Sequence, residues 1–112
     1  MTFATRHNKP KAQFNYELTD EHRYVSLKEL DQDTIYVVQG LYISDSGLYG
    51  DAPVIVTDKY LVNAPQHLTK QVNKIIRDPR SVKQINEGLV GFKVISYTNK
   101  YGQQLTIEWV DL

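Results

Sequence analysis

Two tyrosines on one predicted strand are the residues of this sequence best suited to recognising a ligand. Residues 34–43 read TIYVVQGLYI, a run rich in the β-branched and aromatic residues that favour strands. Because successive side chains of a strand point to opposite faces, Tyr36 and Tyr42 are expected to share a face, with Gly40 between them. Exposed flat rings stack on unpaired bases, so the pair predicts a surface for single-stranded nucleic acid. The alternative is that both rings cap the core and keep their hydroxyls in water.

Three further residues extend this predicted surface. Tyr60 opens another predicted strand, and Tyr97 shares a predicted face with Lys93 close to the end of the chain. Aromatic rings beside cations are typical of grooves that bind single strands. The sequence therefore adds Tyr60, Lys93 and Tyr97 to the candidate binding residues.

A row of cations lies on the helix predicted in the middle of the chain. Lys70, Lys74 and Arg77 are spaced i, i+4 and i+7, so they share one helix face, opposite an apolar stripe. Such a row either contacts phosphates, which makes binding salt-dependent, or is an ordinary solvated face. A second basic set lies within residues 6–11.

No arrangement of residues in the sequence is typical of catalysis. His7, His22 and His67 lie far apart, without the spacing of metal ligands. Asp45 and Asp51 flank a glycine-rich turn, where aspartate usually bonds the local backbone. No phosphate-binding loop is present, and the absence of cysteine excludes disulfides, thiolate metal sites and cysteine nucleophiles. We therefore expect no enzyme activity, no metal and no cofactor.

Strand signals dominate the first half of the chain. Residues 1–22 show neither helix nor strand periodicity and are predicted to form a flexible arm, ordered only where Phe14 or Tyr16 docks. Ser26 and Glu29 have the spacing of a capping box at the start of a short helical turn. Strands are predicted over 34–43, 53–57 and 60–63, with a turn over 44–52.

Helix periodicity replaces strand periodicity after Pro65. Leu68, Val72, Ile75 and Ile76 recur at i, i+4, i+7 and i+8, which predicts an apolar stripe facing the core.

A second helix and a hairpin are predicted after this stripe. Asp78 is the expected N-cap of the second helix and Gly88 its expected end. Strands over 90–98 and 104–109, joined by a turn at 99–102, follow.

This order of elements predicts a mainly β fold. Five strands with a helical segment between the third and fourth match the OB-fold, a small Greek-key barrel. We expect one OB-like domain over 23–112, preceded by the arm over 1–22. An SH3-like barrel with an insertion and an open α+β sheet are compatible alternatives.

Composition and charge narrow the class of protein further. The chain has 112 residues, enough for one domain, and no apolar run of the roughly 20 residues that span a bilayer. We therefore expect a soluble cytoplasmic protein without a membrane partner. Its 13 acidic and 13 basic residues balance, but residues 28–58 are acidic and residues 59–83 basic. Because nucleic-acid binders are usually basic, the neutral total favours an alternative function, protein–protein interaction through the acidic surface of residues 31–58, with a protein partner or a second copy.

Several features resemble small phage-encoded proteins of Gram-positive hosts. They are the strand over 34–43, the segment YLVNAP at 60–65 that leads into a helix, and the closing hairpin that carries Trp109. Over about residues 24–112 the chain is similar to their short OB-fold single-stranded-DNA-binding proteins. The resemblance implies single-stranded DNA as partner, a role in phage or prophage replication or recombination, and a location in the host cytoplasm. A phage accessory or inhibitor protein that acts by protein–protein interaction is the alternative.

Overall fold

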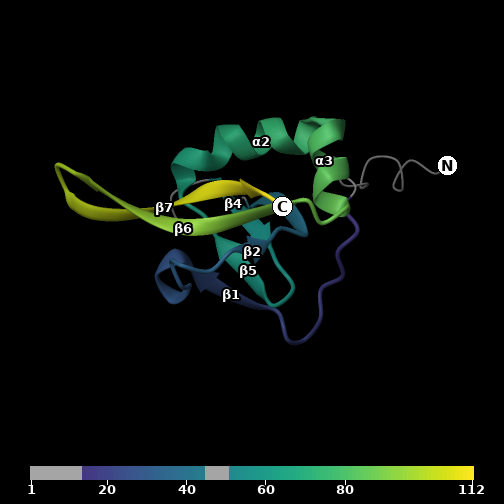
Figure 1. Cartoon of the computed structure of the whole chain (residues 1–112), viewed down its shortest axis with the longest axis horizontal. Helices are drawn as coiled ribbons and strands as arrows, with labels where there is room; N and C mark the ends of the chain where they lie inside the picture. The colour runs from purple at the N-terminus through teal and green to yellow at the C-terminus, as the bar shows by residue number, and fades with distance from the viewer. Residues whose placement is uncertain (1–13, 45–50) are drawn as a thin grey trace.

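The computed structural model describes residues 14–44 and 51–112, which form two β-sheets with helices along one side (Figure 1). The strands are β1 (Arg23–Ser26), β2 (Tyr36–Val37), β3 (Gly40–Ser44), β4 (Ala52–Val56), β5 (Tyr60–Asn63), β6 (Val90–Asn99) and β7 (Gly102–Asp111). The helical elements are the 3₁₀ turns η1 (Leu27–Glu29) and η2 (Gln66–Leu68) and the helices α2 (Thr69–Arg77) and α3 (Pro79–Asn86). One sheet has the strand order β1-β5-β4-β3, and the other has the order β2-β6-β7.

Most strand pairs are antiparallel and local in sequence. Strands β3, β4 and β5 form a meander, whereas β1 joins the far edge of β5 in parallel, with Arg23 beside Tyr60. The β6–β7 hairpin closes through the Asn99–Gly102 pair, where Gly102 adopts a φ of 101°. The turn predicted at 99–102 is therefore confirmed. The hairpin extends well beyond the rest of its sheet (Figure 1).

Strands β2 and β3 are two halves of the single strand predicted over 34–43. Between them, the N–H of Val38 donates to Val90 O at 2.9 Å, in the three-stranded sheet. The N–H of Gln39 donates to Val56 O at 2.7 Å, in the four-stranded sheet. The chain therefore crosses from one sheet to the other at these two residues, and the regular alternation of faces expected over 34–43 is broken there.

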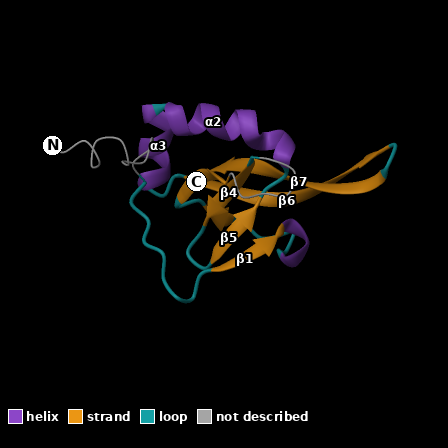
Figure 2. Cartoon of the chain, turned by 180° about the vertical axis from the view of Figure 1, so that it is seen from behind, coloured by secondary structure: helices purple, strands orange, loops and turns teal. Residues whose placement is uncertain are grey.

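The core lies between the two sheets and is closed on one side by the helices (Figure 2). Val72 of α2 and Ile85 of α3 are buried in it, and Leu68, Ile75 and Ile76 pack against it. The predicted apolar stripe is thus confirmed. Both sheets contribute buried side chains to the same core, namely Leu41, Ile55, Val62, Phe92, Val94 and Ile107.

The predicted ends of α3 are also confirmed. The carboxylate of Asp78 accepts from the Ser81 hydroxyl at 2.7 Å and from the Arg80 N–H at 3.2 Å. The hydrogen bond from Ser81 is the main reason that the pKa of Asp78 is lowered. Gly88, with a φ of 75°, follows the helix in the left-handed conformation that glycine tolerates.

Strand β1 was not predicted. It leads directly into η1, where the Glu29 carboxylate accepts from the Ser26 N–H at 2.7 Å, as the capping-box spacing predicts. Val25, Leu27 and Leu30 are buried in the core. The segment that was expected to hold only a helical turn therefore also supplies an edge strand.

The mainly β class is confirmed, but the described residues do not form a closed five-stranded barrel. They form seven strands in two sheets. Strand β1 occupies the edge of β5, and within the described part of the chain β7 pairs only with β6, so the sheets stay open between β5 and β7.

The expected arm is described only in part. Residues 1–13 lie outside the described residues, as do 45–50 of the predicted turn. Residues 14–22 form neither helix nor strand, but Phe14 packs against the core and Tyr16 against the outer side of the four-stranded sheet. No described helix is long and apolar enough to cross a membrane.

Candidate nucleic-acid interface

Three tyrosines lie on the outer face of the four-stranded sheet, the side away from the core. Tyr24 and Tyr42 project from the edge strands β1 and β3, and Tyr16 comes from the segment before β1. Beneath Tyr16 and Tyr42 lies a small second cluster of buried side chains, made of Val54, Val56 and Leu61. We call Tyr16, Tyr24 and Tyr42 the tyrosine face.

Two hydroxyls of the tyrosine face are hydrogen-bonded to each other. The hydroxyl oxygens of Tyr24 and Tyr42 are 3.2 Å apart. The pKa of Tyr42 is raised, first by burial and then by its hydrogen bond with Tyr24. The negative charges that Tyr24 and Tyr16 would carry on ionisation raise it further. Burial also raises the pKa of Tyr16. Tyr24 is 62% exposed, so its ring is open to a ligand.

A glycine makes room for the Tyr16 ring. The ring lies where a side chain at position 40 would stand, because a Cβ added to Gly40 would overlap Cδ1 and Cε1 of Tyr16. One residue earlier, the N–H of Asn15 donates to Oδ1 of Asn86 at 3.0 Å, which ties the segment to the end of α3. The position of Tyr16 thus depends on contacts far away in the sequence.

Tyr36 is partly buried against the core, on the other side of the molecule's sheets from Tyr42. Its ring stacks on Phe92, with centroids 5.5 Å apart and an angle of 27° between the planes. Its hydroxyl accepts from the N–H of Asp31 at 3.0 Å. The expectation that Tyr36 and Tyr42 share a face is wrong, because the crossover at Val38 and Gln39 changes which alternate side chains point inward.

Tyr60 also packs on the core side rather than on the tyrosine face. Its ring meets Tyr36 edge-on, with centroids 6.4 Å apart. The guanidinium of Arg23 lies 5.5 Å from the centre of the Tyr60 ring, within the range of a cation–π contact. Arg23, Tyr60 and Tyr36 therefore form a row that runs from solvent toward the buried Phe92.

Lys93 and Tyr97 lie on the outer face of the three-stranded sheet. Lys93 Nζ is 4.0 Å from a carboxylate oxygen of Glu108, its partner across β7. Tyr97 is 40% exposed and lies further out along the hairpin, opposite Gln104. The structure keeps these two residues on one face, as predicted, but on a different sheet from the tyrosine face.

Lys70, Lys74 and Arg77 are exposed on α2. The helix packs through Val72 against the core, which is the inner side of the four-stranded sheet. The row of cations and the tyrosine face therefore lie on different sides of that sheet. The eight predicted binding residues lie in four separate places, one of which is the core side with Tyr36 and Tyr60, and only Tyr42 belongs to the tyrosine face.

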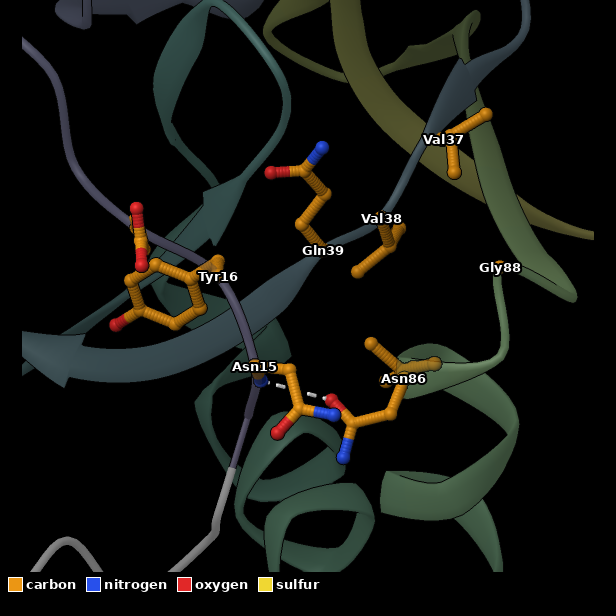
Figure 3. Close-up of a pocket in the computed structure, with 9 residues that line it drawn as sticks. Asn15, Tyr16, Val37, Val38, Gln39, Asn86 and Gly88 are labelled. Atoms are coloured by element: carbon orange, nitrogen blue, oxygen red, sulfur yellow. Dashed lines mark hydrogen bonds between the residues drawn. The ribbon is translucent and has the colours of Figure 1, made fainter.

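A pocket of about 480 Å³ adjoins the tyrosine face (Figure 3). It lies among three segments, which are residues 15–17, the crossover residues 37–39, and the end of α3 with Gly88. Tyr16 belongs to both the pocket and the tyrosine face.

Sequence reasoning missed Tyr16 and Tyr24. For Tyr24 a signal existed, since Tyr24 and Ser26 alternate with the apolar Val25 and Leu27 over four residues. For Tyr16 no local signal exists, because the side chain is held by Gly40 and by residues much later in the chain.

No family model matches the chain, and neither does any curated protein or solved structure. Within residues 14–44 and 51–112, no three histidine or acidic side chains gather as a metal site would require.

Proposed function

We propose that this protein binds single-stranded nucleic acid without catalysing a reaction, through the tyrosine face. The observation that carries the proposal is the placing of three tyrosines on the outer face of one sheet, with the Tyr24 ring largely exposed. Successive unpaired bases stack on such rings, and each stack contributes about 1–3 kcal/mol.

The order of the strands supports an OB-like reading of the fold. If β2 and β3 are counted as one strand, the order across both sheets is β5, β4, β3/β2, β6 and β7, with the helices between β5 and β6. The five OB strands would follow this order, with the barrel left open where β1 takes the edge of β5. OB-folds bind oligonucleotides on the face of their second and third strands. Those strands correspond here to β4 and β5, which the tyrosine face covers.

The charge distribution predicts how binding should depend on salt concentration. The cations Lys70, Lys74 and Arg77 lie on a helix on the other side of the sheet, and the chain is neutral overall. Each phosphate contact with a single strand makes the slope of log affinity against log salt steeper by about 0.7. Binding that depends on stacking at the tyrosine face should therefore weaken only slightly as salt rises.

The test is the fluorescence anisotropy of a labelled oligothymidine titrated with the protein at low and at high salt. Tyr24→Ala should weaken binding by about 1–3 kcal/mol, or about 5- to 150-fold, at both salt concentrations. Tyr101→Ala is the matched control, because Tyr101 is 76% exposed at the tip of the hairpin, away from the tyrosine face. Absence of binding by the unchanged protein at micromolar concentration would refute the proposal.

Tyr36→Ala should affect stability rather than binding, although the sequence pattern predicts a binding residue at this position. Because the ring stacks on Phe92 and packs in the core, the substitution should lower thermal stability before it affects binding. Tyr36 is therefore a poor probe of the interface, whereas Tyr24 is a good one.

The proposed setting is the replication or recombination of phage or prophage DNA in the host cytoplasm, as the resemblance of residues 24–112 implies. The protein's own strands and tyrosines support only the binding step of this proposal.

A protein-interaction function is the second candidate, and one observation favours it. Ile35, Val37 and Leu112, each between 45% and 49% exposed, cluster around Gly91 on the outer face of the three-stranded sheet. A group of exposed aliphatic side chains is typical of a contact surface. Sedimentation of the protein over a range of concentrations tests for self-association there, and Val37→Lys should abolish it. A protein that stays monomeric at every concentration would remove a second copy as the partner.

A further inference from the structure

The pocket beside the tyrosine face combines apolar walls with carboxamide groups. Its volume of about 480 Å³ lies within the range of small-molecule sites. Val37 and the Tyr16 ring supply apolar surface, whereas Val38 and Ile85 behind them are almost fully buried, and Asn15, Gln39 and Asn86 supply carboxamides. Asn15 and Asn86 lie together on one side of the pocket, with Val38 and Gln39 across from them (Figure 3). The Gln39 carboxamide is directed away from Asn15 and Asn86, so a ligand that fills the pocket would meet carboxamides at its two ends (Figure 3).

The lining residues disfavour a charged ligand. None of the described residues around the pocket is a lysine, arginine or histidine, and Glu17 is the one ionisable carboxylate among them. A phosphate would therefore meet repulsion and no compensating cation. A carboxamide offers one acceptor and two donors, which suits a neutral group that carries donors and acceptors side by side. A nucleobase is a flat apolar body with such an edge.

The pocket is continuous with the surface proposed to stack bases. Tyr16 lines the pocket and also packs on the outer face of the sheet with Tyr42. We propose that one base of a bound single strand leaves the stack and enters this pocket, with adenine preferred. The proposal rests on the proposed function, because the base is delivered by a strand lying on the tyrosine face. Asparagine and glutamine pair with two edge atoms of adenine, which is the reason for the preference.

Two hydrogen bonds from backbone N–H groups fix the main chain around the pocket before any ligand arrives. The N–H of Gln39 donates to Val56 O at 2.7 Å, which fixes Gln39 at the crossover between sheets. The N–H of Asn15 donates to Asn86 Oδ1 at 3.0 Å, which joins two walls of the pocket. Because the main chain on these sides of the pocket is already ordered, a base that enters has only side chains left to order, which limits the cost in conformational entropy. An unpaired base in a single strand also leaves its stack at low cost.

The test compares two oligonucleotides of about 16 nucleotides, the upper end of the sites that OB-folds cover. One is oligothymidine, and the other has a single central adenine in place of thymine. The adenine should tighten binding about fivefold, the low end of the discrimination given by a two-atom contact. Gln39→Leu, which keeps the size of the side chain but removes its polar atoms, should abolish this gain and leave the affinity for oligothymidine unchanged.

Matched variants keep the test decisive. Gln103→Leu is the control, because Gln103 is exposed on the hairpin, away from the pocket. Asn15→Ala replaces Gln39→Leu if that variant fails to fold, since Asn15 holds Asn86 through its backbone N–H and not its side chain. An adenine gain that is absent, or that survives both pocket substitutions, overturns the base pocket while the proposed function stands. Failure of both oligonucleotides to bind the unchanged protein overturns the proposed function itself.

Discussion

Replacing Gly40 by alanine should destabilise the protein, although alanine normally suits a strand better than glycine does. Gly40 has no positive φ, so its backbone accepts an L side chain without strain. In a strand, alanine in place of glycine is worth about 0.5–1 kcal/mol in favour of the folded state. Here the added Cβ overlaps the Tyr16 ring and lies 3.3 Å from Cβ of Phe14, so the segment that carries both rings must move away.

The size of the loss follows from what these two rings bury. Full burial of a large apolar side chain contributes about 1.5–3 kcal/mol, and Phe14 and Tyr16 are each half-buried. Releasing both therefore costs about 2 kcal/mol, part of which is offset by the freedom that the segment regains. We expect Gly40→Ala to lower the free energy of unfolding by about 1–2 kcal/mol. For a domain of this size, the melting temperature should fall by about 4–8 °C.

A double-mutant cycle with Tyr16→Ala gives the sharpest measurement. Once the Tyr16 ring is gone, the alanine at position 40 has room, so Gly40→Ala should become neutral or stabilising in that background. The sign of its effect on the melting temperature should therefore reverse, with a coupling free energy of about 2 kcal/mol. Thermal melts of the four proteins, followed by circular dichroism, measure this directly. Equal destabilisation in both backgrounds would show that the Tyr16 ring is not the neighbour that forbids a side chain at position 40.

Three other results are expected. Ile75→Ala should lower the free energy of unfolding by about 1–3 kcal/mol in a denaturant melt, because Ile75 packs against the core. Lys74→Ala, on the exposed face of α2, should leave it almost unchanged. Equal losses would mean that the inward face of the helix is misassigned. A chain that begins at Phe14 should melt like the full chain, and one that begins at Glu21 should keep a cooperative melt at a lower temperature. Loss of cooperativity in the shorter chain would show that the two sheets do not fold without residues 14–20. Folding raises the pKa of Tyr42, so its contribution to stability should be fully present below about pH 10, the ordinary pKa of tyrosine, and should be lost as the pH rises above it. Tyr42→Phe should reduce this loss of stability in thermal melts at alkaline pH. An unchanged loss would assign it to other groups.

Local patterns in the sequence predicted the elements whose stability is local. The helical stripe through Val72, the N-cap at Asp78 and the turn before Gly102 all depend on residues within a few positions of one another. Each is found where it was expected. Such features carry their own geometric signature, so periodicity and capping rules identify them.

The errors arise where distant hydrogen bonds decide the structure. The strand over 34–43 reads as one continuous element, but the N–H groups of Val38 and Gln39 donate to different sheets. That crossover places Tyr36 inside and Tyr42 outside, which alternation alone does not predict. The prediction of a closed barrel was wrong for a similar reason. Strand β1 is only four residues long, and it pairs with the edge of β5, more than 30 positions away in sequence.

The docking of residues 14–16 also has a consequence for the order in which the protein can fold during synthesis. Asn15 leaves the ribosome early, but its hydrogen-bond partner Asn86 follows 71 positions later. At about 5–20 residues per second, that interval lasts about 4–14 s. During this interval the hydrogen bond that ties the segment to the end of α3 cannot form, although Gly40 and the cluster beneath Tyr16 have already been synthesised. The attachment of residues 14–16 to α3 is therefore a late step of synthesis, made only after all strands of the four-stranded sheet have been synthesised.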